Sequence, residues 1–218
     1  MKKVLTVVLL VAAFCSCKKS TDTTIPSSIE PLTPGNYWRY AFVTGTDSAS
    51  AKKDTFKLTV LSGDSIIQGH SYKILSDSLK KYNFFYRSVG DTDYRRGLFS
   101  TIKGGLIPDI EEPYYLENSP LNTTWKLPIS IVYSGIPITA TNNYKIVSYT
   151  DTITVAGTKY TNVSHVVLTV LLADGKTQIG GGNFYYSKGY GAISYVFSVS
   201  YFGVGIYQSE TLLSSHIQ

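Results

Sequence analysis

Few side chains of this chain have the types and spacing that catalysis requires. The histidines are His70, His165 and His216. His165 lies in a β-type run and shares a face with Val163 and Val167, which favours a hydrogen-bonded strand histidine over a catalytic base. Neither a Gly-x-Ser-x-Gly nor a His-Glu-x-x-His motif occurs in the sequence. We therefore expect no enzymatic activity. A hydrolase would need His165, or the acidic segment described next, to line a cleft.

Acidic residues gather in one segment, where carboxylates could bind a cation. Asp109, Glu111, Glu112 and Glu117 lie close together in the sequence. Calcium is held by carboxylate and carbonyl oxygens on loops, but the spacing here matches no calcium-binding loop. We therefore expect a solvated acidic surface, with neither a metal nor another cofactor.

The N-terminus has the pattern of a secretory leader. Residues 1–3 are a basic start, residues 4–13 are an apolar run, and the small Ser16 precedes Cys17. The run is too short to cross a bilayer as a helix, which takes about 20 residues. The stretch resembles a bacterial lipobox, in which the cysteine is lipidated and becomes the mature N-terminus. The resemblance implies a signal peptide over residues 1–16, acyl chains on Cys17 and attachment to a membrane.

Residues 17–30 are polar and rich in Ser and Thr, which is typical of a flexible tether. Lys18, rather than an aspartate, after the cysteine favours the outer membrane, with its periplasmic and surface faces both left open. The formal net charge is +5, but lysines of the leader and tether supply much of it. No clustered basic stripe remains, so nucleic acid is not an expected partner. Both cysteines lie in or beside the leader, which excludes a disulfide framework and Cys-ligated zinc in the folded body.

Residues 31–218 are predicted to form a single all-β domain. β-branched and aromatic residues alternate with polar ones, and no stretch has a 3.6-residue apolar period. The expected strands are 37–44, 55–61, 72–75, 84–89, 94–102, 124–133, 138–148, 152–155, 161–172, 178–187, 192–202 and 206–213. Gaps at 62–64, 173–175 and 203–205 contain Gly and are typical of hairpin turns. The pattern predicts an antiparallel meander that forms a curled sheet, barrel or sandwich and so protects its edges.

Landmark residues recur in the same order in the two halves of this domain, which indicates an internal repeat. The matching pairs are Trp38 with Trp125, Tyr72 with Tyr160, and Tyr86 with Tyr186. The halves cover about 31–103 and 120–202, and each would carry an apolar face that it cannot bury alone. We therefore expect two similar half-units that share one core.

Two motifs of this domain have a wider resemblance. Gly35-Asn-Tyr-Trp-Arg-Tyr40 lies near its start, and Tyr185-Tyr-Ser-Lys-Gly-Tyr-Gly191 lies later. Both resemble stretches of uncharacterised lipoproteins of the Bacteroidota, which implies an exported scaffold of unknown activity and no functional residues to carry over. Gly189 and Gly191 are expected to mark a bulge or a close backbone approach. No helix is expected after them, so they do not form a dinucleotide-binding fingerprint.

Tyrosine is over-represented, with 18 residues. Tyrosine suits half-buried strands, so packing is the simpler interpretation, and an aromatic platform for a sugar or an envelope protein is the alternative. Segment 104–120 joins the two halves and is the longest loop-like stretch, and long loops are often functional. The candidate partner-binding residues are Glu111, Glu112, Tyr114 and Tyr115 in this segment.

Five Asp-Ser or Asp-Thr pairs are followed by Ala, Ile, Leu or Thr. The pattern resembles the O-glycosylation site of exported Bacteroidota proteins. The candidate hydroxyls are those of Thr23, Ser48, Ser65, Ser78 and Thr152. Ser48 and Ser65 are expected at hairpin turns, where a glycan meets no steric obstacle. The alternative is that these aspartates only cap the local backbone.

Together these patterns predict a lipid-anchored envelope lipoprotein that binds, or structurally supports, an envelope protein or glycan without catalysis. A carrier of an apolar ligand inside a curved sheet is the alternative, and a hydrolase is the third possibility. An interior cavity lined by apolar side chains would favour the carrier over a solid core, and converging polar groups in a cleft would favour the hydrolase.

Overall fold

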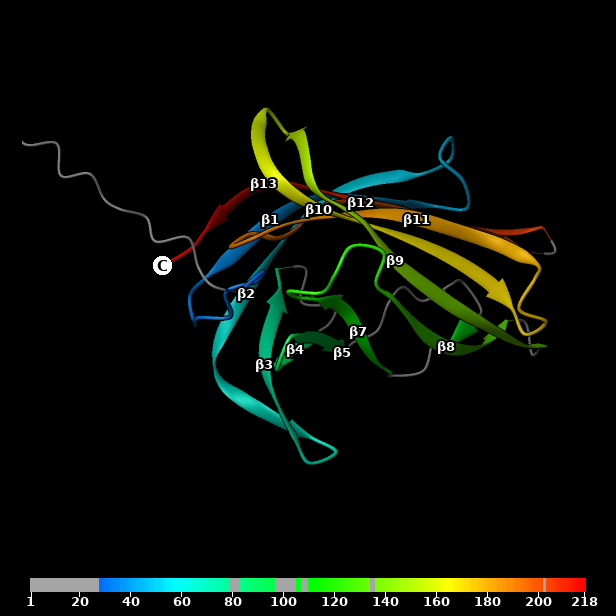
Figure 1. Cartoon of the computed structure of the whole chain (residues 1–218), viewed down its shortest axis with the longest axis horizontal. Helices are drawn as coiled ribbons and strands as arrows, with labels where there is room; N and C mark the ends of the chain where they lie inside the picture. The colour runs from blue at the N-terminus through cyan, green and yellow to red at the C-terminus, as the bar shows by residue number, and fades with distance from the viewer. Residues whose placement is uncertain (1–27, 79–82, 97–104, 107–109, 134–135, 202) are drawn as a thin grey trace, which may run out of the picture.

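The structure is a computed structural model that describes residues 28–78, 83–96, 105–106, 110–133, 136–201 and 203–218 (Figure 1). These residues form β-strands and no helix, so none of their segments could cross a membrane as a long apolar helix. The strands are β1 (Tyr37–Gly45), β2 (Lys52–Ile67), β3 (His70–Asp77), β4 (Asn83–Val89), β5 (Thr92–Arg96), β6 (Gly105–Leu106), β7 (Glu111–Leu116), β8 (Thr124–Tyr133), β9 (Ile136–Val155), β10 (Thr158–Leu172), β11 (Gln178–Ser187), β12 (Gly191–Tyr201) and β13 (Val204–His216). The all-β prediction is confirmed.

The strands form one antiparallel sheet. Its order is β6-β8-β9-β10-β11-β12-β13-β1-β2-β3-β4-β5-β7. Two meanders, β1–β5 and β8–β13, are joined because β13 pairs with β1. Strand β7 extends the first meander beside β5, and the short β6 extends the second beside β8. The predicted antiparallel meander is confirmed. The first and last strands, β1 and β13, pair with each other in the middle of the sheet.

The sheet curls until its two ends meet through side chains. In Figure 1, β3, β4, β5 and β7 lie below the layer that contains β1 and β10–β13. The indole nitrogen of Trp125 on β8 donates to the carbonyl of Pro113 on β7 over 2.7 Å. The hydroxyls of Tyr115 on β7 and Ser164 on β10 are also 2.7 Å apart. These contacts make the curled sheet a nearly closed barrel.

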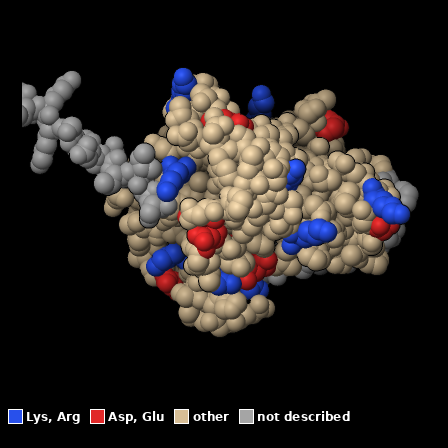
Figure 2. Space-filling model, viewed as in Figure 1, with Lys and Arg blue, Asp and Glu red and all other residues tan. Residues whose placement is uncertain are grey.

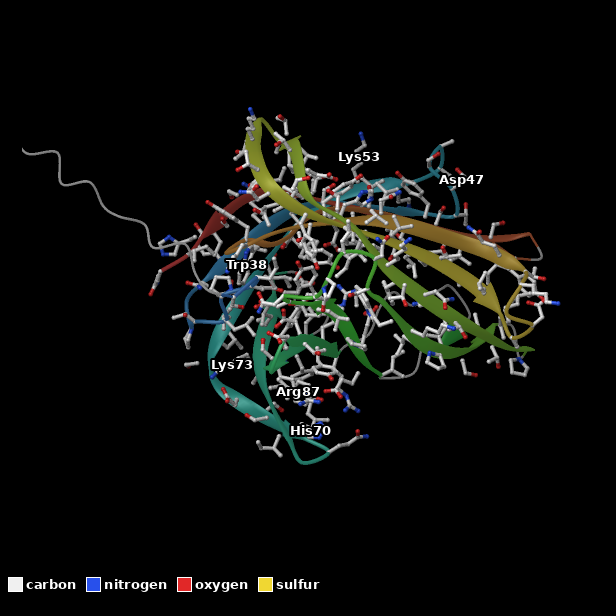
Figure 3. All side chains as sticks on the ribbon, viewed as in Figure 1. Trp38, Asp47, Lys53, His70, Lys73 and Arg87 are labelled. Carbon is white, nitrogen blue, oxygen red and sulfur yellow. The ribbon has the colours of Figure 1, made fainter. Side chains whose placement is uncertain are left out.

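The core lies inside this curl and begins immediately before β1. Trp38 and Leu75 are fully buried, and Figure 3 shows Trp38 between the two layers. The carbonyl of Ile29 accepts a hydrogen bond from the Gly191 amide over 2.7 Å, and the Ile29 amide donates to the carboxylate of Glu117 over 2.6 Å. The chain is therefore attached to the interior as soon as its described part begins.

Consecutive glycines allow β11 to lie close to the strands on both of its sides. A Cβ atom on Gly180 would lie 2.3 Å from the Ser198 carbonyl oxygen, and one on Gly182 would lie 2.4 Å from that of Val196. On the other side, a Cβ on Gly181 would lie 2.5 Å from the carbonyl oxygen of Leu168. Glycines therefore permit a close backbone approach of β11 to both of its neighbours, β10 and β12.

Three local predictions were wrong. The gap at 62–64 is not a hairpin turn but an irregularity inside β2, where Gly63 has a φ of 88°, and the turn comes later at Gln68–Gly69. The two strands expected over 138–155 are one continuous strand, β9. Segment 104–120, expected to be a loop, contains β6 and β7. In each case pairing with a neighbouring strand outweighs the local turn signal.

The proposed duplication stays a prediction. The two tryptophans lie on β1 and β8, the first strands of the two meanders, and Trp125 is only partly buried whereas Trp38 is fully buried. The hairpins β2–β3 and β9–β10 turn through residues with positive φ, which are Gln68 and Gly69 in one and Ala156 and Gly157 in the other. Superposing residues 31–103 on 120–202 tests whether the corresponding strands coincide.

Candidate functional site

An apolar cavity lies inside the curl of the second meander. Its volume is about 150 Å³. Alternate residues of six adjacent strands line it, because only one face of each strand points inward. The apolar lining residues of these strands are Leu127 and Ile129 (β8), Ile138 and Ala140 (β9), Leu168 and Val170 (β10), Ile179 and Phe184 (β11), Tyr195, Phe197 and Val199 (β12), and Ile206 (β13).

Several of these inward-facing side chains are not fully covered. Leu127 and Ile129 are half-buried, whereas their neighbours Lys126 and Ser130, on the other face of β8, are exposed. On β12, Phe197 is likewise half-buried. Because an apolar side chain turned inward would normally be fully covered, the concave face carries apolar surface that its own chain leaves partly uncovered.

Polar groups form one end of the cavity. The guanidinium Nε of Arg95 on β5 lies 3.0 Å from a carboxylate oxygen of Glu112 on β7. The hydroxyl of Tyr144 on β9 donates to the other oxygen of Glu112. Nearby, the side-chain oxygen of Asn142 is buried and has no hydrogen-bond partner among the described residues. The cavity therefore combines an apolar wall with a buried ion pair and a hydrogen-bond acceptor that no described residue satisfies.

Other buried carboxyl groups lie around this polar end. The side chain of Glu30 is 6% exposed and accepts a hydrogen bond from the Tyr114 hydroxyl over 2.7 Å. Burial raises the pKa of Glu30 to about 7, although the Tyr114 hydrogen bond acts against this. Burial also raises the pKa of Glu210 to about 7, and its bond from the Tyr195 hydroxyl opposes the rise. Tyr114 and Tyr195 thus serve as hydrogen-bond partners of acidic groups inside the fold.

The four candidate partner-binding residues lie on β7, and three of them are buried. Glu112, Tyr114 and Tyr115 are each 5% exposed or less, so the expected solvated loop is wrong at these positions. Glu111 is less buried and is bound by Arg87 and by the Tyr72 hydroxyl. The structure therefore brings these residues together as interior supports and leaves them little surface that a partner could contact.

His165 occupies a strand position, as predicted, and its imidazole is hydrogen-bonded. Its Nε2 lies 2.8 Å from the side-chain oxygen of Asn183, its Nδ1 lies 3.5 Å from Asp151, and Tyr185 stacks on its ring. Ser148 donates to the other oxygen of Asp151. Asp151 thus stands between the hydroxyl and the imidazole, which is the wrong order for a histidine that activates a serine.

His70 lies beside the β2–β3 turn, as expected, where Figure 3 shows it at the tip of the hairpin. Figure 3 also places Asp47 at the outer end of the β1–β2 connection, where its carboxylate accepts hydrogen bonds from the Ala49 and Ser50 amides. Among the residues that the structure describes, no group of three His, Cys, Asp or Glu could hold a metal ion. On the face seen in Figure 2, charges of both signs are scattered.

The candidate O-glycosylation residues lie in different settings. Ser48 is exposed in the β1–β2 connection, and Ser78 is exposed directly after β3. Ser65 was expected at a hairpin turn but lies within β2. Thr152 is exposed within β9. Thr23 and the proposed lipidation residue Cys17 lie outside the described residues. Modification of these residues stays a prediction.

The sequence raised an interior cavity only as the alternative, and it identified none of the lining residues, although part of their signal is present. The alternation in Trp125-Lys-Leu127-Pro-Ile129 identifies an inward face of β8. The curvature that separates a filled core from a hollow one depends on long-range pairing, which the alternation does not encode. The consecutive glycines at 180–182 are a local signal of close strand packing beside the cavity.

No protein-family profile matches the chain, and no curated protein sequence matches it. Some solved structures show partial similarity. One is a protein from Bacteroides fragilis described as exported and as having a YmcC-like fold, with a TM-score of 0.47 and 10% identity over 85% of this chain and 97% of that one.

Two further solved structures are similar to the same extent. A lipoprotein from Parabacteroides distasonis has a TM-score of 0.45 and 12% identity over 87% of this chain and 98% of that one. The hypothetical lipoprotein YmcC from Escherichia coli has a TM-score of 0.47 and 10% identity over 85% and 87%. Identities and TM-scores this low do not assign the chain to a family.

Proposed function

We propose that this protein is a lipid-anchored lipoprotein of a bacterial outer membrane that holds an apolar ligand inside its curled sheet, without catalysis. The membrane attachment rests on the lipobox-like sequence that ends at Cys17. The ligand-holding role rests on one observation, the cavity lined by inward apolar residues of β8–β13. Of the roles considered from the sequence, the carrier is the one that this cavity supports.

The dimensions and chemistry of the cavity limit its ligand. A volume of about 150 Å³ is similar to that of apolar protein cavities that bind a benzene-sized group. The cavity therefore suits one alkyl chain or one aromatic ring. The unsatisfied oxygen of Asn142 favours a ligand that carries a hydrogen-bond donor next to its apolar part.

Binding of a single-ring apolar probe tests this proposal. p-Cresol, one aromatic ring with a hydroxyl donor, should bind the parent protein saturably in titration calorimetry, and 1-hexanol should compete with it. Ile129→Glu places a charge on the half-buried cavity wall and should weaken probe binding at least about tenfold, because an apolar ligand cannot solvate the carboxylate.

Ser130→Glu is the matched control, since Ser130 is the next residue and points to solvent. It should bind the probe like the parent. Equal binding by Ile129→Glu and the parent, with both variants folded, would show that the probe binds elsewhere and would remove the support for a carrier.

A further inference from the structure

A second, larger hollow lies at the other end of the β9–β10 hairpin. It has a volume of about 650 Å³ and is formed by the segment after β7, the β9–β10 hairpin and the β11–β12 turn. Its wall includes the tyrosines Tyr149, Tyr160 and Tyr190, and Ile29 lies at its border. We refer to this hollow as the tyrosine groove. It shares no lining residue with the apolar cavity.

The aromatic part of the groove offers a ring at the surface. Tyr190 is 40% exposed, and its ring lies 5.4 Å from that of Tyr160 at an interplanar angle of 83°. The hydroxyl of Tyr149 is held by the carbonyl of Ser119 over 2.5 Å, which fixes that ring. Fixed aromatic rings beside polar groups provide apolar contact area with little loss of side-chain entropy on binding.

Two side-chain amides with hydrogen-bonding capacity left over among the described residues stand beside these rings. Asn162 lies at an irregularity of β10 with a φ of 54°, and no hydrogen bond of its amide side chain is recorded within the described part of the chain. Such irregularities re-aim a side chain away from the regular strand direction. Asn118 uses its amide nitrogen to bind Asp91, which leaves its oxygen as an acceptor.

The charge of the groove is set by two lysines and one glutamate. Lys159 and Lys188 are exposed on its border, and no ion pair of either is recorded in the described ranges. The carboxylate of Glu117 is bound by the Ile29 amide. The two ammonium groups are therefore available to an anionic ligand, whereas the nearby carboxylate already has a partner.

We infer that the tyrosine groove binds an acidic saccharide. A pyranose ring presents an apolar face that packs on an aromatic ring, and its hydroxyls match side-chain amides. A carboxylate on the saccharide matches Lys159 and Lys188. A volume of about 650 Å³ lies within the usual range of small-ligand sites. This site is independent of the apolar ligand proposed above, because different residues form it.

Titration calorimetry with trigalacturonate tests the inference, using the full chain with Cys17→Ser to exclude acyl chains. A dissociation constant of roughly 0.1–1 mM is expected for an open site of this kind. Tyr190→Ala should weaken binding about tenfold, whereas Tyr190→Phe keeps the ring and should bind within about twofold of the parent. Lys188→Gln should weaken binding about threefold and reduce its salt dependence.

Lys176→Gln is the control for charge, because Lys176 lies in the β10–β11 turn away from the groove. It should leave binding unchanged. Absence of saturable binding up to about 10 mM, or equal binding by Tyr190→Ala and the parent, would overturn the inference.

Two additional probes separate possible sources of the saccharide. The methyl ester of trigalacturonate should bind more weakly than the acid. Tighter binding to vesicles that carry glucuronosyl diacylglycerol than to free trigalacturonate would identify a glycolipid headgroup, and the reverse order a free polysaccharide. Binding to phosphatidylglycerol vesicles alone, without any saccharide binding, would contradict the inference in favour of a simple anionic membrane contact.

Discussion

The ion pair of Arg95 and Glu112 illustrates how individual residues support the interior of this fold. Their side chains are 18% and 7% exposed, and Tyr144 donates a further hydrogen bond to Glu112. Arg95 also lies over the ring of Tyr114, 5.5 Å from its centroid. A buried charge is tolerated only when partners of this kind surround it, so the pair stabilises the fold only as long as both members remain.

Removing one member of the pair should therefore be costly. Glu112→Ala is expected to lower the free energy of unfolding by about 3–5 kcal/mol, because it leaves Arg95 buried without its carboxylate. The double variant Arg95→Met, Glu112→Met should lose less than the single variant. Urea denaturation of the three proteins measures the difference, and a smaller loss for the single variant than for the double would contradict this account.

A second residue-scale prediction concerns pH. Burial raises the pKa of Glu30 to about 7, and Asp93 raises it further whereas Tyr114 and Arg95 lower it. The folded protein thus holds a proton that the unfolded chain releases above about pH 4.5. The stability from this group is complete below that pH and is lost as the pH rises toward 7, up to roughly 3 kcal/mol.

The variant Glu30→Gln isolates this effect, because glutamine can still accept the Tyr114 hydrogen bond. It should remove part of the fall in unfolding free energy between pH 5 and pH 8, measured by urea denaturation at each pH. Glu210 and Asp93, whose pKa values burial also raises, keep the remaining dependence in both proteins. Parallel pH profiles for the parent and the variant would refute the assignment to Glu30.

For individual residues, the sequence identified candidate site residues better than it predicted their surroundings. It singled out Glu112, Tyr114 and Tyr115, but as members of a solvated loop, and it described His165 correctly as a hydrogen-bonded strand residue. His165 bonds to residues of β9 and β11, the strands on either side of its own. The residues of β7 are buried by β8, β10 and β11, which approach only when the sheet has curled.

Strand β11 lies unusually close to both of its neighbours. Its glycines at 180–182 face carbonyl oxygens of β10 and β12 at distances that admit no Cβ atom. Gly182→Ala should therefore push β12 away and lower the free energy of unfolding by about 1–3 kcal/mol. Gln178→Ala, on an exposed residue of the same strand, should change it by less than about 0.5 kcal/mol. Thermal unfolding of both variants compares them, and equal losses would contradict this close approach.

The sequence predicted elements well where alternation was long and unambiguous. The strands from 161 to 187, with the turn at Ala173-Asp-Gly175 between them, are close to β10 and β11 as observed. It failed where glycine can serve either as a turn or as a bulge, as at Gly63, because only the partner strand decides which occurs. It also missed β6 and β7, which are short and lie among Gly and Pro residues.

For the whole molecule, the decisive prediction is membrane attachment. Changing Cys17 to Ala should leave the protein soluble or uncleaved, since more than one acyl chain is needed for durable anchoring. Membrane fractionation with salt and carbonate washes, followed by mass measurement of the processed chain, gives the answer. Continued processing and retention in the washed membrane would exclude the lipobox interpretation.

The attachment of residues 28–30 to the interior also determines how a mechanical load would pass through the molecule. These residues bond to Glu117 after β7 and to Gly189 and Gly191 at the β11–β12 turn, and Glu30 reaches Tyr114 inside the barrel. Tension applied at the N-terminus would therefore be shared by segments from the middle and the last third of the chain. It would have to break these bonds together before it could peel β1 from β13, so these bonds reinforce the N-terminal end of the protein mechanically.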